Sequence, residues 1–175
     1  MPLDEGPNWR YSGVADQVLF EKAHMIHSPT CQHALRALIY LAERDANRPV
    51  LVREIAEAAG APHPTLAKIL HSLRGRGLVR STKGPGGGYQ LARPSDQMRV
   101  IEVIEAVDGP IDLEQVCVLG LDTCSDHASC ALHDVWKLFR QNYATTISNM
   151  TLSRAAEVLK AKRLARGVAN VPSKE

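Results

Sequence analysis

Two adjacent amphipathic patterns between residues 52 and 73 constrain the fold more than any other part of the sequence. The first predicts a short helix over 52–59 that Gly60 ends, because glycine readily adopts the left-handed conformation that closes many helices. Pro64 suits the first position of a second helix, whose apolar residues recur at helical spacing. These apolar residues are Leu66, Ile69, Leu70 and Leu73. The two helices and their short connection predict a helix-turn-helix.

The polar face of the second predicted helix becomes informative only in context. It carries Thr65, Lys68, His71 and Ser72, whose side chains can donate hydrogen bonds to bases or phosphates. An amphipathic helix with a merely solvated face would show the same pattern. The residues that follow decide between these two interpretations.

Residues 78–91 have the pattern of a β-hairpin with a basic, glycine-rich tip. Two short extended segments, 78–79 and 89–91, flank the connection RSTKGPGGG. Its glycines permit positive φ angles and let the backbone approach a phosphate closely. A nucleotide-binding P-loop is excluded because no Gly-Lys-Ser/Thr motif follows the glycines. Helix, turn, helix and basic hairpin in this order predict a winged helix that binds double-stranded DNA.

The predicted DNA contacts divide between the second helix and the hairpin, or wing. We expect Thr65 and Lys68 to face the major groove, and Arg80 and Lys83 to contact phosphate or to reach the minor groove. The net charge of the chain is only +2, so this basic surface must be local. The full predicted set is Thr65, Lys68, Ser72, Arg74, Arg80, Lys83, Gly86 and Gly87.

Three cysteines lie together in the stretch CVLGLDTCSDHASCALHDVW, which begins at Cys117. Cys124 and Cys130 follow at x6 and x5 spacing, and His133 comes three residues later, on the same face of any helix that Cys130 opens. Glycine, aspartate and serine between the cysteines favour a loop that can fold around one small object. Thiolates are the soft ligands of iron–sulfur clusters, and an imidazole can replace one of them. The loop therefore predicts an iron–sulfur cluster held by these four residues.

Other chemistry at this loop stays open. Zinc also accepts three thiolates and one imidazole, although structural zinc sites commonly contain closer cysteine pairs and this loop has no CxxC. A reversible disulfide between two of the thiols is a further alternative. The fourth ligand could instead be His127 or a residue from the first helix of a partner subunit. Cys31 is expected to be a buried structural thiol, the alternative being ligation of a partner's cluster.

A long helix predicted over 131–149 carries more apolar surface than a small domain readily covers. Its apolar side chains are Leu132, Val135, Trp136, Leu138, Phe139, Tyr143 and Ile147. A winged-helix domain of this size is small for burying them alone, and most homo-oligomers are two-fold symmetric. The helix therefore predicts a homodimer, the alternative being that it packs back onto its own domain.

The patterns divide the chain into five parts. Further helices are predicted over 30–44, 99–107 and 151–159. The expected parts are an N-terminal extension at 1–24, a winged-helix domain at 25–110, a cysteine-bearing loop at 111–131, dimerisation helices at 132–160 and a flexible tail at 161–175. The sequence from Met25 looks like a complete N-terminus in its own right, so we treat the extension as optional.

The composition points to a cytoplasmic protein that has no membrane partner. No apolar run approaches the ~18 residues of a transmembrane helix, and the start lacks the pattern of a secretory signal. Thiols in the cytoplasm usually stay reduced, so clustered cysteines there indicate metal binding or redox chemistry more readily than a structural disulfide. No nucleophile–base pair and no paired carboxylates at telling spacing indicate an enzyme.

The chain also resembles the IscR/NsrR (Rrf) family of bacterial winged-helix regulators. The resemblance rests on CQHALRALIYLA, LVREIAEAAGAPHPTLAKILHSLRGRGLV, KGPGGGYQLARP and VIEAVDGP, and it covers about residues 25–160. It implies a dimeric transcription factor, in many members with a [2Fe-2S] or [4Fe-4S] cluster on cysteines where Cys117, Cys124 and Cys130 stand. In the iron–sulfur-biogenesis branch a histidine at the position of His133 completes the site.

Two departures from that branch bear on what the resemblance implies. The first cysteine gap is one residue longer, which bears on cluster type, and Ala67 replaces a glutamate of the second helix, which bears on the operator sequence. The sequence thus predicts a mainly α-helical winged-helix homodimer that binds a palindromic operator under control of an iron–sulfur cluster. The alternatives are a cluster-free thiol- or zinc-dependent regulator and a metal- or thiol-dependent enzyme on a DNA-binding scaffold.

Overall fold

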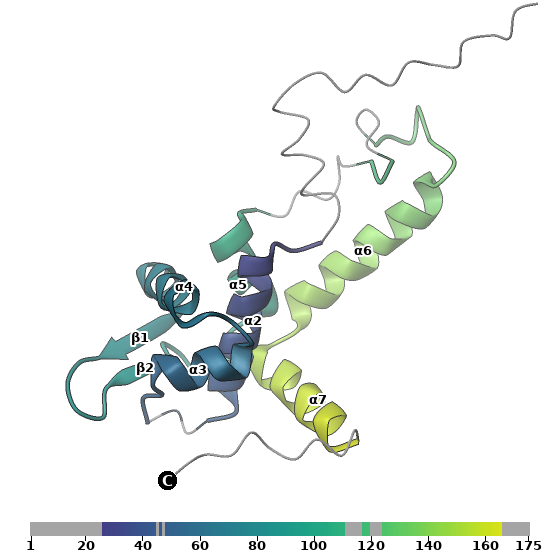
Figure 1. The fold of residues 1–175 in the computed structure, drawn as a ribbon. Coiled ribbons are helices and arrows are strands. Elements are labelled where there is room, and N and C mark those ends of the chain that lie inside the picture. Colours follow the sequence, from purple (N-terminus) through teal and green to yellow (C-terminus); the bar gives the residue numbers. More distant parts are fainter. Residues whose placement is uncertain (1–25, 45, 47, 111–116, 120–123, 166–175) are drawn as a thin grey trace, which may run out of the picture.

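The computed structural model describes residues 26–44, 46, 48–110, 117–119 and 124–165. The described part is mainly helical with one two-stranded antiparallel sheet, which confirms the predicted fold class (Figure 1). The elements are α2 Pro29–Ala42, α3 Val52–Ala59, α4 His63–Gly75, β1 Val79–Thr82, β2 Gly88–Leu91, the 3-10 turn η1 Ser95–Gln97, α5 Val100–Asp108, α6 His133–Asn149 and α7 Leu152–Ala165. The predicted N-terminal extension lies outside the described residues.

The helix-turn-helix forms where the apolar spacing predicted it. Gly60 ends α3 in the left-handed conformation, with φ 63°. α4 begins at His63, one residue before the proline that was expected to start it, and Pro64 occupies its first turn. A proline is tolerated there because the first helical N–H groups have no partner within the helix.

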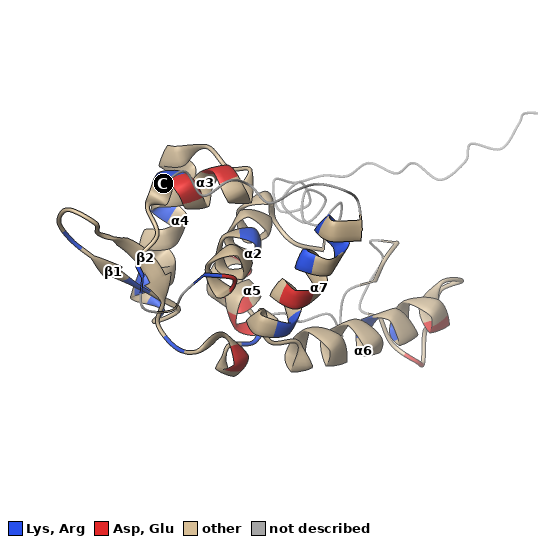
Figure 2. Cartoon of the chain, turned by 90° about the horizontal axis from the view of Figure 1, so that it is seen from below, with Lys and Arg blue, Asp and Glu red and all other residues tan. Residues whose placement is uncertain are grey.

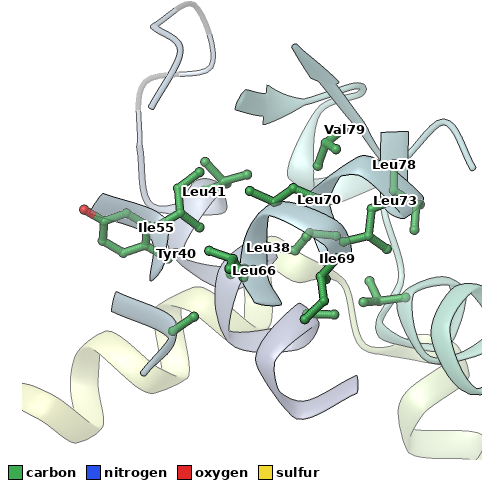
Figure 3. Packing of buried hydrophobic residues seen from close by; sticks show 14 of the residues in the cluster. Leu38, Tyr40, Leu41, Ile55, Leu66, Ile69, Leu70, Leu73, Leu78 and Val79 are labelled. Atoms are coloured by element: carbon green, nitrogen blue, oxygen red, sulfur yellow. The ribbon is translucent and has the colours of Figure 1, made fainter. Parts of the chain in front are cut away.

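One hydrophobic core joins the helix-turn-helix to α2, to the hairpin and to the start of α7. Leu66, Leu70 and Leu73 of α4 are fully buried, and so is Leu38 of α2. Figure 3 shows these side chains gathered with Ile55 of α3, while Leu78 and Val79 extend the cluster toward the hairpin. This packing fixes the apolar face of α4 inward, so that its polar face is presented to solvent.

The hairpin is longer than the sequence predicted. β1 runs through Arg80, Ser81 and Thr82, because its register with β2 pairs Thr82 with Gly88. Two backbone hydrogen bonds of 2.8 Å between Val50 and Tyr89 attach β2 to the chain before α3. A Cβ atom at Gly88 would lie 2.2 Å from the Val50 carbonyl oxygen, so this position requires glycine.

α6 extends away from the winged helix, and only its C-terminal part packs against the domain (Figure 1). It begins at His133 rather than at residue 131, because Leu132 has the non-helical angles φ −106° and ψ 8°. Ile147 is buried in a small cluster with Cys31 and Ile104, and Tyr143 packs against this cluster. No helix among the described residues is long and apolar enough to cross a membrane.

α7 differs from the predicted helix in length. It continues past residue 160 to Ala165, so the expected tail from 161 begins as helix. No glycine or proline interrupts the sequence before Gly167, and the Arg163 guanidinium donates to the Glu43 carboxylate of the segment after α2. Leu152 and Ala156 are buried, which anchors the start of α7 in the winged-helix core.

Candidate nucleic-acid interface and cysteine loop

Most of the residues predicted to contact DNA lie on the surface of α4 and the hairpin. The exposed members of the predicted set are Thr65, Lys68, Ser72, Arg74, Arg80, Lys83 and Gly86. Gly87 is buried instead, and a Cβ atom there would lie 2.3 Å from the Thr82 carbonyl oxygen. Its glycine is therefore needed to close the hairpin turn, whatever else it does.

The surface formed by α4 and the hairpin is basic although the chain as a whole is nearly neutral. Between residues 58 and 95 the sequence has six lysines and arginines and no aspartate or glutamate. Figure 2 shows basic positions on the hairpin, whereas acidic positions occur on α3 and α5. Within the described residues, Lys68, Arg80 and Lys83 form no ion pair, so their charges are available to a polyanion. Arg74 donates to the Ser81 hydroxyl over 3.2 Å and so links the end of α4 to the wing.

The cysteine loop brings the four predicted cluster ligands together as two pairs. The Cys117 and Cys130 sulfurs lie 3.9 Å apart. The Cys124 sulfur lies 3.2 Å from Nδ1 of His133. None of these three cysteines forms a disulfide within the described residues; Cys117 is buried and the other two are partly exposed. Residues separated by up to 16 positions thus form two close pairs, one of two sulfurs and one of a sulfur and a nitrogen.

His133 is held in place by partners that the sequence did not indicate. It is only 4% exposed, and its Nε2 lies 2.8 Å from Oδ1 of Asp126. Lys137, one helical turn further along α6, donates to both Asp126 oxygens over 2.8 and 2.7 Å. The hydrogen bond from Lys137, followed by that from His133, lowers the pKa of Asp126 to about 2. We infer that Nε2 carries the proton and that the Nδ1 lone pair faces Cys124, the tautomer that a metal ligand needs.

The four donor atoms lie in two close pairs and not in one group of the size that a single zinc ion would hold. Around one zinc the ligand atoms would all lie about 3.4–3.8 Å apart. Within the described residues, no three of the four donor atoms lie within 4.8 Å of one another. Two irons with two protein ligands each would use one such pair per iron. His127 is exposed, which favours His133 as the nitrogen ligand.

Cys31 stands apart from this loop. It is 0% exposed, packs between α2, α5 and α6, and confirms the prediction of a buried thiol. Burial raises its pKa to about 12, with the Asp108 carboxylate acting in the same direction.

The sequence left Asp126 and Lys137 unassigned, because neither lies at a spacing from His133 that a motif would reveal.

Comparisons with known proteins cover most of the chain. A family model described as Rrf2, an iron-dependent transcriptional regulator, matches residues 27–157. Over 122 residues the chain is 34% identical to the HTH-type transcriptional regulator IscR of Sodalis glossinidius, spanning 70% of this chain and 73% of that protein. The structure is similar to that of T. potens IscR, with a TM-score of 0.57 and 26% identity over 79% of this chain and 89% of the other. It also resembles CymR, the global cysteine regulator of B. subtilis, with a TM-score of 0.62 and 24% identity over 75% and 95% of the two chains.

Proposed function

The chain belongs to the Rrf2 family of iron-dependent transcriptional regulators and is a DNA-binding regulator rather than an enzyme, and we propose that an iron–sulfur cluster on its cysteine loop controls its DNA binding. The observation that carries this proposal is the pairing of Cys117 with Cys130 and of Cys124 with His133. The orientation of His133 by Asp126 supports it, since a carboxylate on the far ring nitrogen is the usual partner of a ligating histidine.

The cluster would be held by Cys117, Cys124, Cys130 and His133. Either a [2Fe-2S] or a [4Fe-4S] cluster can take thiolate ligands, and the arrangement in two pairs favours the two-iron form. When bound, the cluster supplies a group whose presence or oxidation state reports iron–sulfur status, redox state or nitric oxide. The protein's own part is to order the loop and to transmit that order to α6, because His133 is the first residue of that helix.

A homodimer formed through α6 completes the proposal. Val135 and Leu138 are 74% and 59% exposed, and Leu132 and Phe139 are also exposed. Trp136, Phe139 and Tyr143 stack along the same helix with ring centroids 5.3 and 5.8 Å apart. An apolar row of this extent on a regulator suits pairing with its own copy about a two-fold axis.

This dimer would read a palindromic operator in the cytoplasm. Each α4 would enter the major groove, with Thr65 and Lys68 toward the bases, while Arg80 and Lys83 of the wing contact the backbone. Two such helices must sit about 34 Å apart to read two half-sites together. A cluster that prefers one loop arrangement would shift α6, and with it the separation of the two α4 helices.

A thiol switch is the second candidate, because the Cys117 and Cys130 sulfurs lie 3.9 Å apart. The visible absorption spectrum of anaerobically purified protein separates the two. We expect broad bands from the near ultraviolet into the visible for the wild type and for Ser129→Ala, a loop change that removes no thiol, and their loss in Cys124→Ser. A colourless wild type that carries one zinc, or that forms a Cys117–Cys130 disulfide on oxidation, would contradict the cluster proposal.

A further inference from the structure

A second group of potential metal ligands lies away from the cysteine loop, where the N-terminal end of α2 approaches the C-terminal end of α5. His27, Cys31 and Asp108 each offer one ligand atom, and these atoms all lie within 4.8 Å of one another. In the part of the chain that the structure describes, no other group of three or more potential metal ligands lies within this distance limit. The three residues bring together a nitrogen, a sulfur and an oxygen donor.

The three side chains are shielded from solvent to different degrees. Cys31 is fully buried, and the side chains of His27 and Asp108 are 16% and 24% exposed. The group therefore lies at the edge of the small cluster in which Tyr143 and Ile147 of α6 pack against α2 and α5. An ion could reach it from the carboxylate side without opening the core.

Neighbouring groups hold the two outer side chains in position. The backbone N–H of Ser28 donates to Oδ2 of Asp108 over 3.0 Å, and the Ser28 hydroxyl donates to Oδ1 over 2.5 Å. The Tyr143 hydroxyl is hydrogen-bonded to Nε2 of His27. Contacts of this kind orient ligands at metal sites, because they fix the side-chain rotamer and, for histidine, the nitrogen that faces the metal.

One atom of this group has no hydrogen-bond partner among the described residues. That atom is Nδ1 of His27, which is buried. It lies 3.9 Å from Oδ2 of Asp108, too far for a hydrogen bond. Ser28, which caps α2, satisfies the Asp108 oxygens by hydrogen bonds but leaves Nδ1 of His27 without one. A buried polar atom left in this way is unfavourable, and a ligand at this position would satisfy it.

We propose that His27, Cys31 and Asp108 bind a divalent transition-metal ion, with Zn²⁺ as the best-fitting one. Imidazole nitrogen, thiolate sulfur and carboxylate oxygen are the donors that this borderline-soft ion accepts, and three protein ligands leave its fourth tetrahedral position for water. On binding, the ligand atoms would close to about 3.4–3.8 Å from one another. The ion would then tie α2 to α5 and, through the Tyr143–His27 contact, to the base of α6.

The experiment removes the loop thiols so that only the second site can supply a thiolate. The full chain carrying Cys117→Ser, Cys124→Ser and Cys130→Ser is titrated with Co²⁺, which reports tetrahedral thiolate ligation by its visible and near-ultraviolet absorption. We expect one Co²⁺ per chain, displaced by one Zn²⁺, with Zn²⁺ raising the thermal unfolding midpoint. Absence of a stoichiometric cobalt spectrum in this background would overturn the proposal and would leave the cluster proposal untouched.

Single changes in the same background identify the ligands. Cys31→Ser should remove the thiolate-to-cobalt band, and Asp108→Asn should weaken binding by at least about tenfold. Asp108 is partly exposed, so its variant tests the site even if Cys31→Ser unfolds, and circular dichroism monitors folding in both. His33→Ala, on the same helix but outside the group, should leave the titration unchanged. A thiolate spectrum that survives Cys31→Ser, or Co²⁺ binding that Asp108→Asn does not weaken, would contradict the assignment.

Discussion

The winged-helix domain and α6 differ in how far their apolar side chains are buried. Leu66, Leu70 and Leu73 of α4 are fully buried against α2 and α3. On α6, by contrast, Val135 and Leu138 are 74% and 59% exposed. Within the described residues, the domain therefore buries these apolar side chains, whereas α6 has apolar surface that the rest of the described chain does not cover.

Because of this difference, we expect substitutions in the two regions to affect different properties of the protein. Changes inside the domain should act on folding, because the side chains there already have all their partners. Changes on α6 and the cysteine loop should act on assembly and on control of DNA binding, because we propose a second copy and a cluster as their partners.

The largest effect is expected from a charge placed on the exposed face of α6. Leu138→Glu should give monomers in sedimentation, because a carboxylate at the proposed interface would lose its hydration without a partner. Operator affinity should fall by about 10²–10⁴-fold, the loss expected when two linked half-site contacts become independent. Leu164→Glu, at an exposed apolar position of α7 beyond the predicted dimerisation helices, is the matched control and should remain dimeric. Dimers that survive Leu138→Glu would place the interface elsewhere.

A core truncation should instead reduce the free energy of unfolding. Leu70→Ala removes a fully buried side chain and should lower the stability by about 2–5 kcal/mol, measured by urea denaturation. For Leu138→Ala, the free energy of unfolding should stay within about 0.5 kcal/mol of the wild-type value. Both proteins are compared at concentrations below the dissociation constant of the dimer, where they are monomers. If the two changes cost the same in the monomer, the contrast between the two regions would be wrong.

The smallest effect is expected at the wing. Lys83→Ala should weaken binding to all DNA sequences alike and reduce the slope of log affinity against log salt by about 0.9, the contribution of one phosphate. Lys160→Ala, which removes an exposed charge from α7, should leave that slope unchanged. The check is a salt titration of operator and non-operator DNA. An unchanged slope for Lys83→Ala would remove this residue from the DNA-binding surface.

Local periodicity was sufficient to predict most of the fold. The apolar spacing of α3 and α4 decides both their helical form and the face they bury, so those helices followed from the sequence almost to the residue. Helix ends were less predictable: α6 starts two residues late and α7 runs six residues beyond its predicted end at 159. These limits depend on backbone turns and on the contact between Arg163 and Glu43, which lie far apart in sequence.

The candidate site was predictable in its residue types but not in its geometry. Four ligand candidates could be named from spacing, yet their division into two pairs and the support of His133 by Asp126 arise only in the folded loop. Likewise, His27 and Asp108 lie 81 positions apart and carry no motif, so their approach follows from the packing of α2 on α5. The burial of Gly87 also depends on the completed turn.

The most direct test of cluster control compares operator-binding curves of cluster-loaded wild type and Cys124→Ser, measured anaerobically at one salt concentration. Ser129→Ala serves as the control for a loop change that spares the ligands, and wild type stripped of iron serves as the control for the cluster itself. We predict that cluster-loaded wild type and Ser129→Ala share one binding curve, and that Cys124→Ser and stripped wild type share another. The two curves should differ on at least one operator. All four samples should remain folded dimers. Superimposable curves for all four on every operator would show that the cluster does not control DNA binding.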